Sequence, residues 1–170
     1  MKLNDETSTY IERECQEVFR DGRRVMGVLC RGTDYVTLSP LGHPIQPTLE
    51  QVFSLLKVKM KELRMDYIYL ATEEKKIEER FKQEFSGKIL INKRSYYDNY
   101  YENKCTYIRE VNFERENDSY YKGLEYFSSI VILSRCQALI GGNTGGSCAA
   151  MFMNNMKYEY THLFDLGCYR

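Results

Sequence analysis

The chain has 170 residues, with 24 lysine and arginine residues against 24 aspartate and glutamate residues. This length suits one globular domain, and a hydrophobic content of 43% is enough for a sizeable core, which argues against a disordered chain. The zero net charge gives no indication of nucleic-acid binding, and no apolar run approaches the roughly 20 residues that a membrane span needs.

A helix and a buried strand open the chain. Residues 1–22 predict an amphipathic helix that ends at a glycine. Residues 25–30 form a continuous apolar run, which is typical of a strand buried on both faces. A second helix follows from about Thr48, because Thr48 and Gln51 form a capping box before an apolar stripe that reaches Leu63.

The next strand is predicted at residues 67–71. Thr72 can cap the helix after it, with Glu73 and Glu74 in the first turn of that helix. Residues 88–91 predict a third strand.

The second half of the chain begins with a long irregular segment. Residues 93–118 show no period and are rich in Tyr and Asn, which predicts a functional or mobile loop. Residues 124–136 predict a covered apolar helix, and a strand at 138–141, a helix at 147–154 and a strand at 162–166 follow. Strands that alternate with helices favour an α/β fold, a Rossmann-like three-layer α/β/α arrangement with a parallel sheet of about five strands.

Six scattered cysteines lack the CxxC spacing of zinc and redox sites. Several lie in apolar runs, so we expect buried free thiols and a reducing compartment. The first residues do not resemble a signal peptide, and we expect a cytoplasmic protein.

Candidate ligand-binding residues follow the predicted strands, because open α/β sheets bind ligands at the carboxyl ends of their strands. We expect three loops to face one crevice. They contain Arg31, Thr33 and Asp34 after the first strand, Thr72, Glu73 and Glu74 after the second, and Asn143, Thr144, Gly145, Gly146 and Ser147 after the fourth.

The glycine-rich loop at residues 143–147 opens a predicted helix. Its glycines allow a ligand close to the backbone, and the helix N-terminus offers free N–H groups to a phosphate. The loop matches neither the Walker A pattern nor GxGxxG. The alternative is that the glycines only permit a tight turn.

Arg31 is the charged residue at the end of the first buried strand. A guanidinium there can hold a diphosphate through two hydrogen bonds and offset its charge as it leaves. The alternative is a structural ion pair with Asp34, Glu73 or Glu74, and the two interpretations agree if an acid orients the arginine.

The chain has two histidines and lacks the common motifs of metal sites and of serine hydrolases. His43 lies on a loop near the same edge, where it could contact a ligand or be only structural, and His162 is expected to be structural. No HExxH, GxSxG or DxD motif occurs, so diphosphate handling without a metal is expected if the protein is a transferase.

Four short motifs resemble those of the α1,6-fucosyltransferases and, more loosely, of the α1,2- and protein O-fucosyltransferases. Residues 27–34 (GVLCRGTD) are similar to the family's H-x-R-R-T-D peptide, and residues 69–74 (YLATEE) look like its Y-L-A-T-D-D. Residues 43–45 (HPI) fall where the family has a similar tripeptide before a helix, and residues 130–147 resemble its last motif. The resemblance runs over residues 25–166.

This resemblance implies the donor-binding half of a GT-B glycosyltransferase, with GDP-fucose as the expected donor and no metal. Arg31 would hold the β-phosphate and stabilise the departing GDP in an inverting displacement. Asp34 and Glu74 would orient Arg31 or contact the donor. The loop at residues 143–147 would cradle the phosphate or ribose, and the helix at Ser129 would pass near the guanine.

The sequence departs from the family pattern in several places. The histidine before the arginine is Leu29, and the second arginine is Gly32. The acidic pair is Glu73-Glu74 in place of two aspartates, and the acid near the guanine corresponds to Ser129. Another nucleotide sugar therefore stays open as the donor.

The resemblance also sets an expectation for domain organisation. Residues 23–170 would form the nucleotide-sugar-binding domain, and the helix at residues 1–22 could be an interdomain linker. A glycan acceptor would then bind through a missing N-terminal domain, and the chain alone would bind nucleotide without turnover. Two alternatives are a non-catalytic nucleotide- or sugar-phosphate-binding module and a flavodoxin-like signalling domain. The latter needs an aspartate where Arg31 stands.

Overall fold

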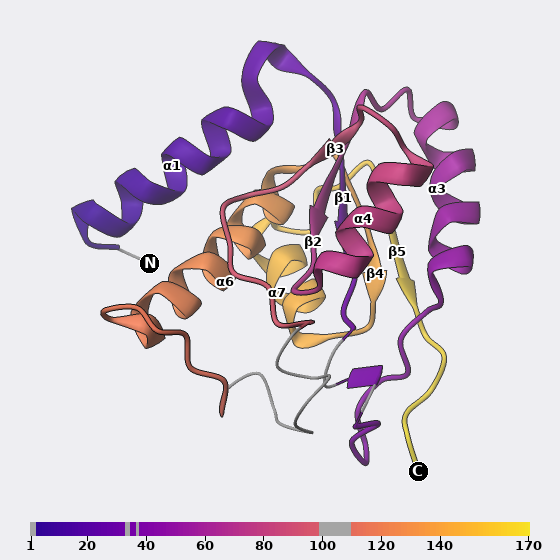
Figure 1. Ribbon diagram of the computed structural model, residues 1–170. Coiled ribbons are helices and arrows are strands. Elements are labelled where there is room, and N and C mark those ends of the chain that lie inside the picture. The colour runs from indigo at the N-terminus through magenta and orange to yellow at the C-terminus, as the bar shows by residue number, and fades with distance from the viewer. Residues whose placement is uncertain (1–2, 33–34, 37, 99–109) are drawn as a thin grey trace.

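The computed structural model describes residues 3–32, 35–36, 38–98 and 110–170. A five-stranded, all-parallel sheet with the strand order β3-β2-β1-β4-β5 lies at its centre (Figure 1). The strands are β1 (Val25–Leu29), β2 (Tyr67–Ala71), β3 (Ile89–Leu90), β4 (Ala138–Gly142) and β5 (Tyr160–Phe164). From the central β1, the chain adds β2 and β3 on one side and β4 and β5 on the other. This order confirms the Rossmann-like prediction.

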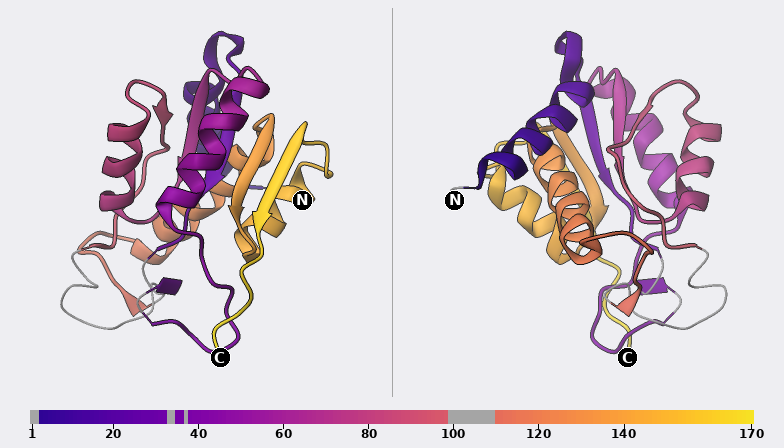
Figure 2. Two further views of the ribbon diagram at one scale, coloured as in Figure 1. Left: turned by 90° about the vertical axis from the view of Figure 1, so that its right-hand side faces the viewer. Right: turned by 60° about the vertical axis from the view of Figure 1, so that its left-hand side comes forward.

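Helices cover both faces of the sheet (Figure 2). One layer contains α1 (Asp5–Phe19), which continues into the short η1 (Arg20–Gly22), together with α6 (Asp118–Arg135) and α7 (Gly145–Met153). The other layer contains α3 (Leu49–Glu62) and α4 (Lys75–Glu84). This confirms the three-layer α/β/α arrangement.

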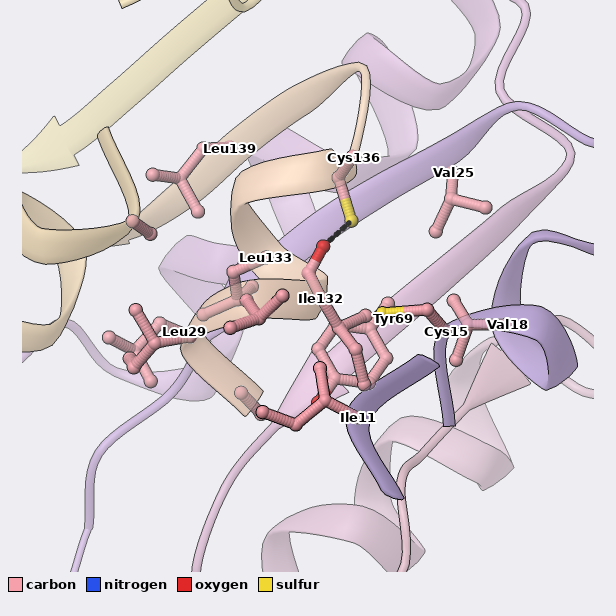
Figure 3. Packing of buried hydrophobic residues seen from close by; sticks show 14 of the residues in the cluster. Ile11, Cys15, Val18, Val25, Leu29, Tyr69, Ile132, Leu133, Cys136 and Leu139 are labelled. Atoms are coloured by element: carbon pink, nitrogen blue, oxygen red, sulfur yellow. Dashed lines mark hydrogen bonds between the residues drawn. The ribbon is translucent and has the colours of Figure 1, made fainter. Parts of the chain in front are cut away.

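Side chains of the central strands alternate between the two helical layers, as the pleat of a strand requires. On β1, Val25 and Leu29 pack with the α1 and α6 layer, whereas Met26 and Val28 pack with α3 and α4. Figure 3 shows the first cluster, where Tyr69 of β2 lies among residues of α1 and α6. The apolar run predicted as a doubly covered strand is therefore confirmed.

The N-terminal helix contributes to this core. Ile11, Cys15 and Val18 form its buried face and pack with residues of α6. Asn4 caps the helix, because its side chain accepts a hydrogen bond from the Thr7 amide at 2.8 Å. The linker role expected for residues 1–22 remains a prediction.

The start of α4 differs from the prediction. Thr72 and Glu74 precede the helix, and the Thr72 hydroxyl accepts from the Glu74 amide in a turn. The amides of Lys75 and Lys76 donate to the carboxylate of Asp98, at 2.6 and 3.0 Å. A side chain from a later loop therefore takes the capping role expected of Thr72.

The boundaries of two other elements also differ from the prediction, although one predicted cap is confirmed. The predicted capping box of α3 is present, with Thr48 and Gln51 hydrogen-bonded to each other's backbone amides. However, α6 begins at Asp118, six residues before the predicted start, and β5 is shifted toward the N-terminus. The first turns of α6 are polar, and the carboxylate of Asp118 holds them by accepting from the Phe113 amide at 3.1 Å.

The cysteines agree with the prediction only in part. Cys15, Cys30 and Cys136 are buried free thiols, and burial raises the pKa of Cys30 to about 12. Cys148 and Cys168 are exposed. The apolar run around Cys148 suggested burial, but that residue lies on the outward face of α7. Cys105 lies outside the described residues.

Candidate functional site

The carboxyl ends of β1, β2 and β4 lie level with one another. Leu29 at the end of β1 pairs with Ala71 of β2 on one side and with Gly141 of β4 on the other. The segments that follow these strands therefore begin at the same edge of the sheet, the lower edge in Figure 1. This register agrees with the expectation that they face one crevice.

Arg31 and Glu73 meet at this edge. The Arg31 Nε atom lies 3.0 Å from the Glu73 Oε1 atom, and the two side chains are 16% and 4% exposed. The Glu73 carbonyl also accepts a hydrogen bond from the Tyr97 amide at 3.0 Å. Both partners are thus held where β1 and β2 end. Glu73 is one of the three acids considered for an ion pair with Arg31, and the orienting role that the resemblance implies for Asp34 and Glu74 remains a prediction.

His43 reaches this group through an aromatic ring. The Arg31 guanidinium lies over the Tyr35 ring, 4.9 Å from its centroid, and the His43 ring lies 5.2 Å from the same ring. His43 is fixed by its backbone, which pairs with Tyr169 near the C-terminus. His43 therefore supports the Arg31 side chain indirectly, through the Tyr35 ring that lies between them.

Glu74 occupies the space beside Gly32. A Cβ atom added at Gly32 would lie 2.2 Å from Glu74 Oε1, so any side chain at position 32 would displace this carboxylate. Thr72, which is fully buried, supports the turn at residues 72–74 that positions Glu74. Thr33 and Asp34, the other two candidates of the first loop, lie outside the described residues.

A pocket of about 320 Å³ opens beside the Arg31–Glu73 pair. Its other walls come from the segment after β3 and from the first half of α6. They include Arg94, Tyr97, Lys122, Glu125 and Tyr126. This volume is at the lower end of the range for small-molecule sites.

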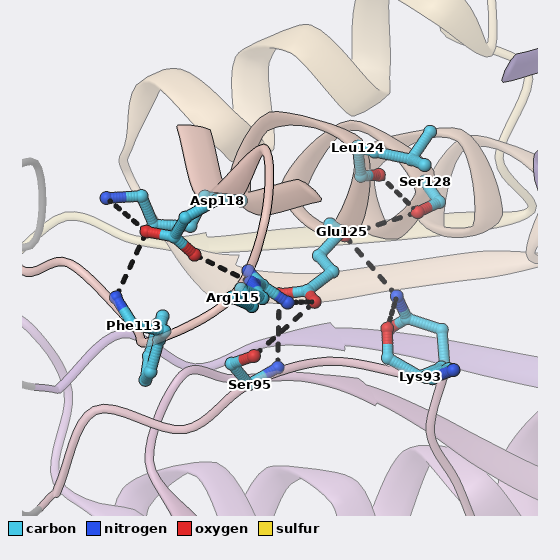
Figure 4. A network of polar contacts seen from close by, with 10 residues as sticks. Lys93, Ser95, Phe113, Arg115, Asp118, Leu124, Glu125 and Ser128 are labelled. Atoms are coloured by element: carbon cyan, nitrogen blue, oxygen red, sulfur yellow. Dashed lines mark hydrogen bonds and ion pairs between the residues drawn. The ribbon is translucent and has the colours of Figure 1, made fainter. Parts of the chain in front are cut away.

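Glu125 anchors two segments that border this pocket (Figure 4). Its carboxylate accepts from the Ser95 amide at 3.1 Å and from Arg115 Nη1 at 2.6 Å. Arg115 also donates to Asp118 at 2.6 Å, and Lys122 lies 3.3 Å from Asp118. These contacts fix the pocket walls, and the carboxylate of Glu125 is neutralised by Arg115.

Ser129 does not reach the pocket. Its side chain is buried, and its hydroxyl donates to the Glu125 carbonyl at 2.9 Å and contacts Asn92 Oδ1 at 3.2 Å. Tyr69 donates to the same Asn92 oxygen. One turn earlier on α6, Glu125 and Tyr126 line the pocket where Ser129 was expected to face a base.

In the glycine-rich loop, backbone amides are available to a ligand, whereas the side chains of Thr144 and Ser147 are used within the loop. Thr144 caps α7, accepting from the Ser147 amide, while the Ser147 hydroxyl donates to the Gly142 carbonyl at 2.7 Å. The amides of Gly145 and Gly146 belong to the first helical turn and have no acceptor within the helix. Asn143 is exposed.

Tyr126 connects this loop to the pocket. A Cβ atom at Gly146 would lie 3.0 Å from the Tyr126 hydroxyl. Burial raises the pKa of that hydroxyl, while the guanidinium groups of Arg31 and Arg94 act in the opposite direction. The pocket, the two arginines and the start of α7 therefore form one neighbourhood.

Three residues that line the pocket, Arg94, Glu125 and Tyr126, were not among the candidates predicted from the sequence. Arg94 lies in the segment without a period. Glu125 and Tyr126 lie in the first turn of the helix predicted from residue 124, which was expected to be covered. The aromatic residues of the same segment were a usable signal. Tyr97 is buried against Phe113, with ring centroids 5.1 Å apart, and burial raises its pKa to about 12.

The described residues contain no group of three or more His, Cys, Asp or Glu side chains placed to hold a metal ion. Within the same ranges, each helix is too short or too polar to cross a membrane.

Sequence comparison and structural comparison give different results. No protein-family model matches the chain, and no curated protein sequence is similar to it. Among solved structures, NodZ α-1,6-fucosyltransferase co-crystallised with GDP superposes with a TM-score of 0.58 at 13% identity, over 96% of this chain and 45% of that one. NodZ from Bradyrhizobium gives a TM-score of 0.56 at 14% identity, over 96% of this chain and 46% of its own.

A second group of similar structures consists of POFUT1. Its complex with GDP-fucose gives a TM-score of 0.54 at 10% identity and matches 91% of this chain and 45% of that one. The chain therefore has a fucosyltransferase-like fold, as the sequence motifs indicated. It spans a little under half the length of the fucosyltransferase chains it matches.

Proposed function

We propose that this domain binds a nucleotide sugar, with GDP-fucose as the favoured donor, and serves inverting, metal-independent glycosyl transfer. The observation that supports this most strongly is the Arg31–Glu73 pair at the shared strand edge, beside a pocket. The fold adds support, because similar structures were solved with GDP and with GDP-fucose.

Arg31 would act on the leaving group. In the proposed reaction an acceptor hydroxyl attacks the anomeric carbon, the bond from that carbon to the β-phosphate oxygen breaks, and the electron pair leaves with GDP. The guanidinium can stabilise the growing charge through parallel hydrogen bonds. Glu73 holds it in place from one side, and the Tyr35 ring supports it from another.

The nucleotide would extend from Arg31 toward the start of α7. Free amides at the first turn of that helix suit a phosphate or a ribose hydroxyl. This keeps Asn143, Thr144, Gly145, Gly146 and Ser147 in the proposed site. In the same proposal Thr33 and Asp34 contact the donor, and the acceptor and its base come from a second domain or partner.

A binding module without transfer chemistry is the second candidate. The Glu74 carboxylate fills the space beside Gly32, so a negative charge lies where the resembling family has a second arginine. A carboxylate in place of an arginine would weaken stabilisation of a leaving diphosphate more than it weakens binding of the neutral parts of the nucleotide.

Removal of the Arg31 side chain tests the proposal. We expect Arg31→Ala to weaken GDP binding by about 10- to 100-fold, since charge-assisted hydrogen bonds contribute roughly 1.5–3 kcal/mol. In a protein that joins this domain to an acceptor domain, transfer should fall by roughly 100- to 1000-fold. Titration calorimetry and a transfer assay measure the two effects.

Arg24→Ala is the matched control. Arg24 precedes the same strand at its opposite end, where it pairs with Glu159. We expect it to leave GDP affinity unchanged. Equal GDP affinity in wild type and Arg31→Ala, with both proteins folded, would remove Arg31 from the site. Intact binding without transfer in the joined protein would favour the second candidate.

A further inference from the structure

Among the residues that the structure describes, the charges around the pocket do not balance. Three of the described lining side chains are cationic, those of Arg31, Arg94 and Lys122, and two are carboxylates, those of Glu73 and Glu125. An excess positive charge in a partly enclosed site is costly unless an anion compensates it.

All of these groups except one have a partner of opposite charge. Arg31 pairs with Glu73, Lys122 with Asp118, and Glu125 with Arg115. Arg94 forms no ion pair with any residue that the structure describes. Its Nε atom is buried and has no hydrogen-bond partner within the same part of the chain. The Arg94 side chain therefore lines the pocket, and its buried Nε donor has no acceptor among the described residues.

The backbone on both sides of Arg94 is anchored. Asn92 accepts from Tyr69 at 2.7 Å and is itself buried. On the other side, the Ser95 amide donates to Glu125, and the Tyr97 amide donates to the Glu73 carbonyl. The anchored backbone fixes the position from which the Arg94 side chain extends, which lowers the entropy lost when that side chain binds a ligand.

We propose that Arg94 is a second phosphate-binding residue, which together with Arg31 holds the two phosphate groups of a nucleoside diphosphate in this pocket. This inference rests on the proposed function. Two guanidinium groups suit a diphosphate because each can form paired hydrogen bonds with one phosphate group. The positive charges of both arginines act to lower the pKa of Tyr126, and its hydroxyl also adjoins Gly146 at the start of α7.

Inorganic pyrophosphate and GDP are the probes. We expect Arg94→Ala to weaken binding of both by roughly 10- to 100-fold, as loss of a charge-assisted contact predicts. Arg94→Lys keeps the charge but not the paired geometry, so it should recover only part of the affinity. Affinities come from titration calorimetry at low salt, and the wild-type affinity should fall as salt is raised.

Lys93→Ala is the control, because it removes an equal charge from the exposed neighbouring position. It should leave both affinities unchanged, and thermal unfolding should show that all three variants are folded. Equal loss in Lys93→Ala and Arg94→Ala would overturn the inference, since a general charge effect would explain both.

The outcomes separate this inference from the proposed function. If wild type binds GDP selectively and Arg94→Ala binds it equally well, the inference fails and the proposed function stands. If pyrophosphate binding depends on Arg94 but GDP is not preferred over other nucleotides, the inference stands and the choice of donor fails. If wild type binds neither probe, both fail.

Discussion

Glu78 is a buried carboxylate away from the pocket, only 1% exposed on the inner side of α4. Its Oε1 atom lies 2.8 Å from the Lys75 ammonium and 2.6 Å from that of Lys82. Burial alone would raise the pKa of this carboxyl, but hydrogen bonds from the two lysines and from Tyr96 outweigh burial and lower it. Glu78 thereby links α4 to the segment that continues to the pocket.

This arrangement predicts a pH-dependent contribution to stability. Because the pKa of Glu78 is lowered on folding, its stabilisation is present above the unfolded pKa of about 4.3 and is lost as the pH falls through the folded value. We expect Glu78→Gln to lower the free energy of unfolding by about 1–3 kcal/mol at pH 7 and by much less near pH 3.

Urea unfolding at the two pH values measures this difference. Glu79→Gln makes the same chemical change at the exposed neighbouring residue and should have little effect at either pH. An equally large loss for Glu78→Gln at pH 3 and pH 7 would show that the carboxylate charge is not what stabilises α4.

At the scale of elements, the approach of α6 to the sheet depends on Gly27 of β1. A Cβ atom there would lie 3.1 Å from Leu133 Cδ2 and 3.2 Å from both Cβ and Sγ of Cys136. Cys136 follows the last turn of α6 directly, so these atoms have little freedom to move away. The helix can lie this close only because position 27 has no side chain.

Two glycine substitutions should therefore have opposite effects. Gly27→Ala overpacks the contact between β1 and α6 and should cost about 1–3 kcal/mol of unfolding free energy. Gly123→Ala lies inside α6 with nothing within 4 Å of the new methyl group, and it should stabilise by up to about 1 kcal/mol. Thermal unfolding of the two variants is the measurement, and stabilisation by Gly27→Ala would contradict the packing argument.

The elements that the sequence predicted well depend on local signals. Thr48 and Gln51 cap α3 across three residues, and the alternation of apolar runs with amphipathic stripes is enough for the order of elements. The cap of α4 could not be predicted in this way. Asp98 lies 23 residues from Lys75, so the contact exists only after the chain has folded.

The candidate site likewise contains residues that local sequence rules predict and residues that only the folded chain brings together. Arg31 and Glu73 each follow a buried strand, and the rule for ligand sites in open α/β sheets is enough to find them. Arg94 reaches the pocket from a segment without periodicity, which is anchored through buried Asn92 and through Glu125 of another element. Only the three-dimensional arrangement brings it to the site.

At the scale of the whole molecule, the two helical layers and the parallel sheet support the edge of the sheet at which the candidate site residues lie. The segments after β1, β2 and β4 begin at this edge, and the C-terminal residues pair with the backbone around His43 beside it. The pocket and the start of α7 lie in the same neighbourhood. We propose that this edge is where the nucleotide of a donor sugar binds.

Calorimetric titration of this chain with GDP, UDP, ADP and NAD, first without metal and then with magnesium, tests that proposal most directly. We expect GDP to bind selectively, with an affinity that magnesium leaves unchanged. Preference for another nucleoside diphosphate would keep a donor domain but replace GDP-fucose. Absence of binding to all four nucleotides by the folded chain would contradict the account.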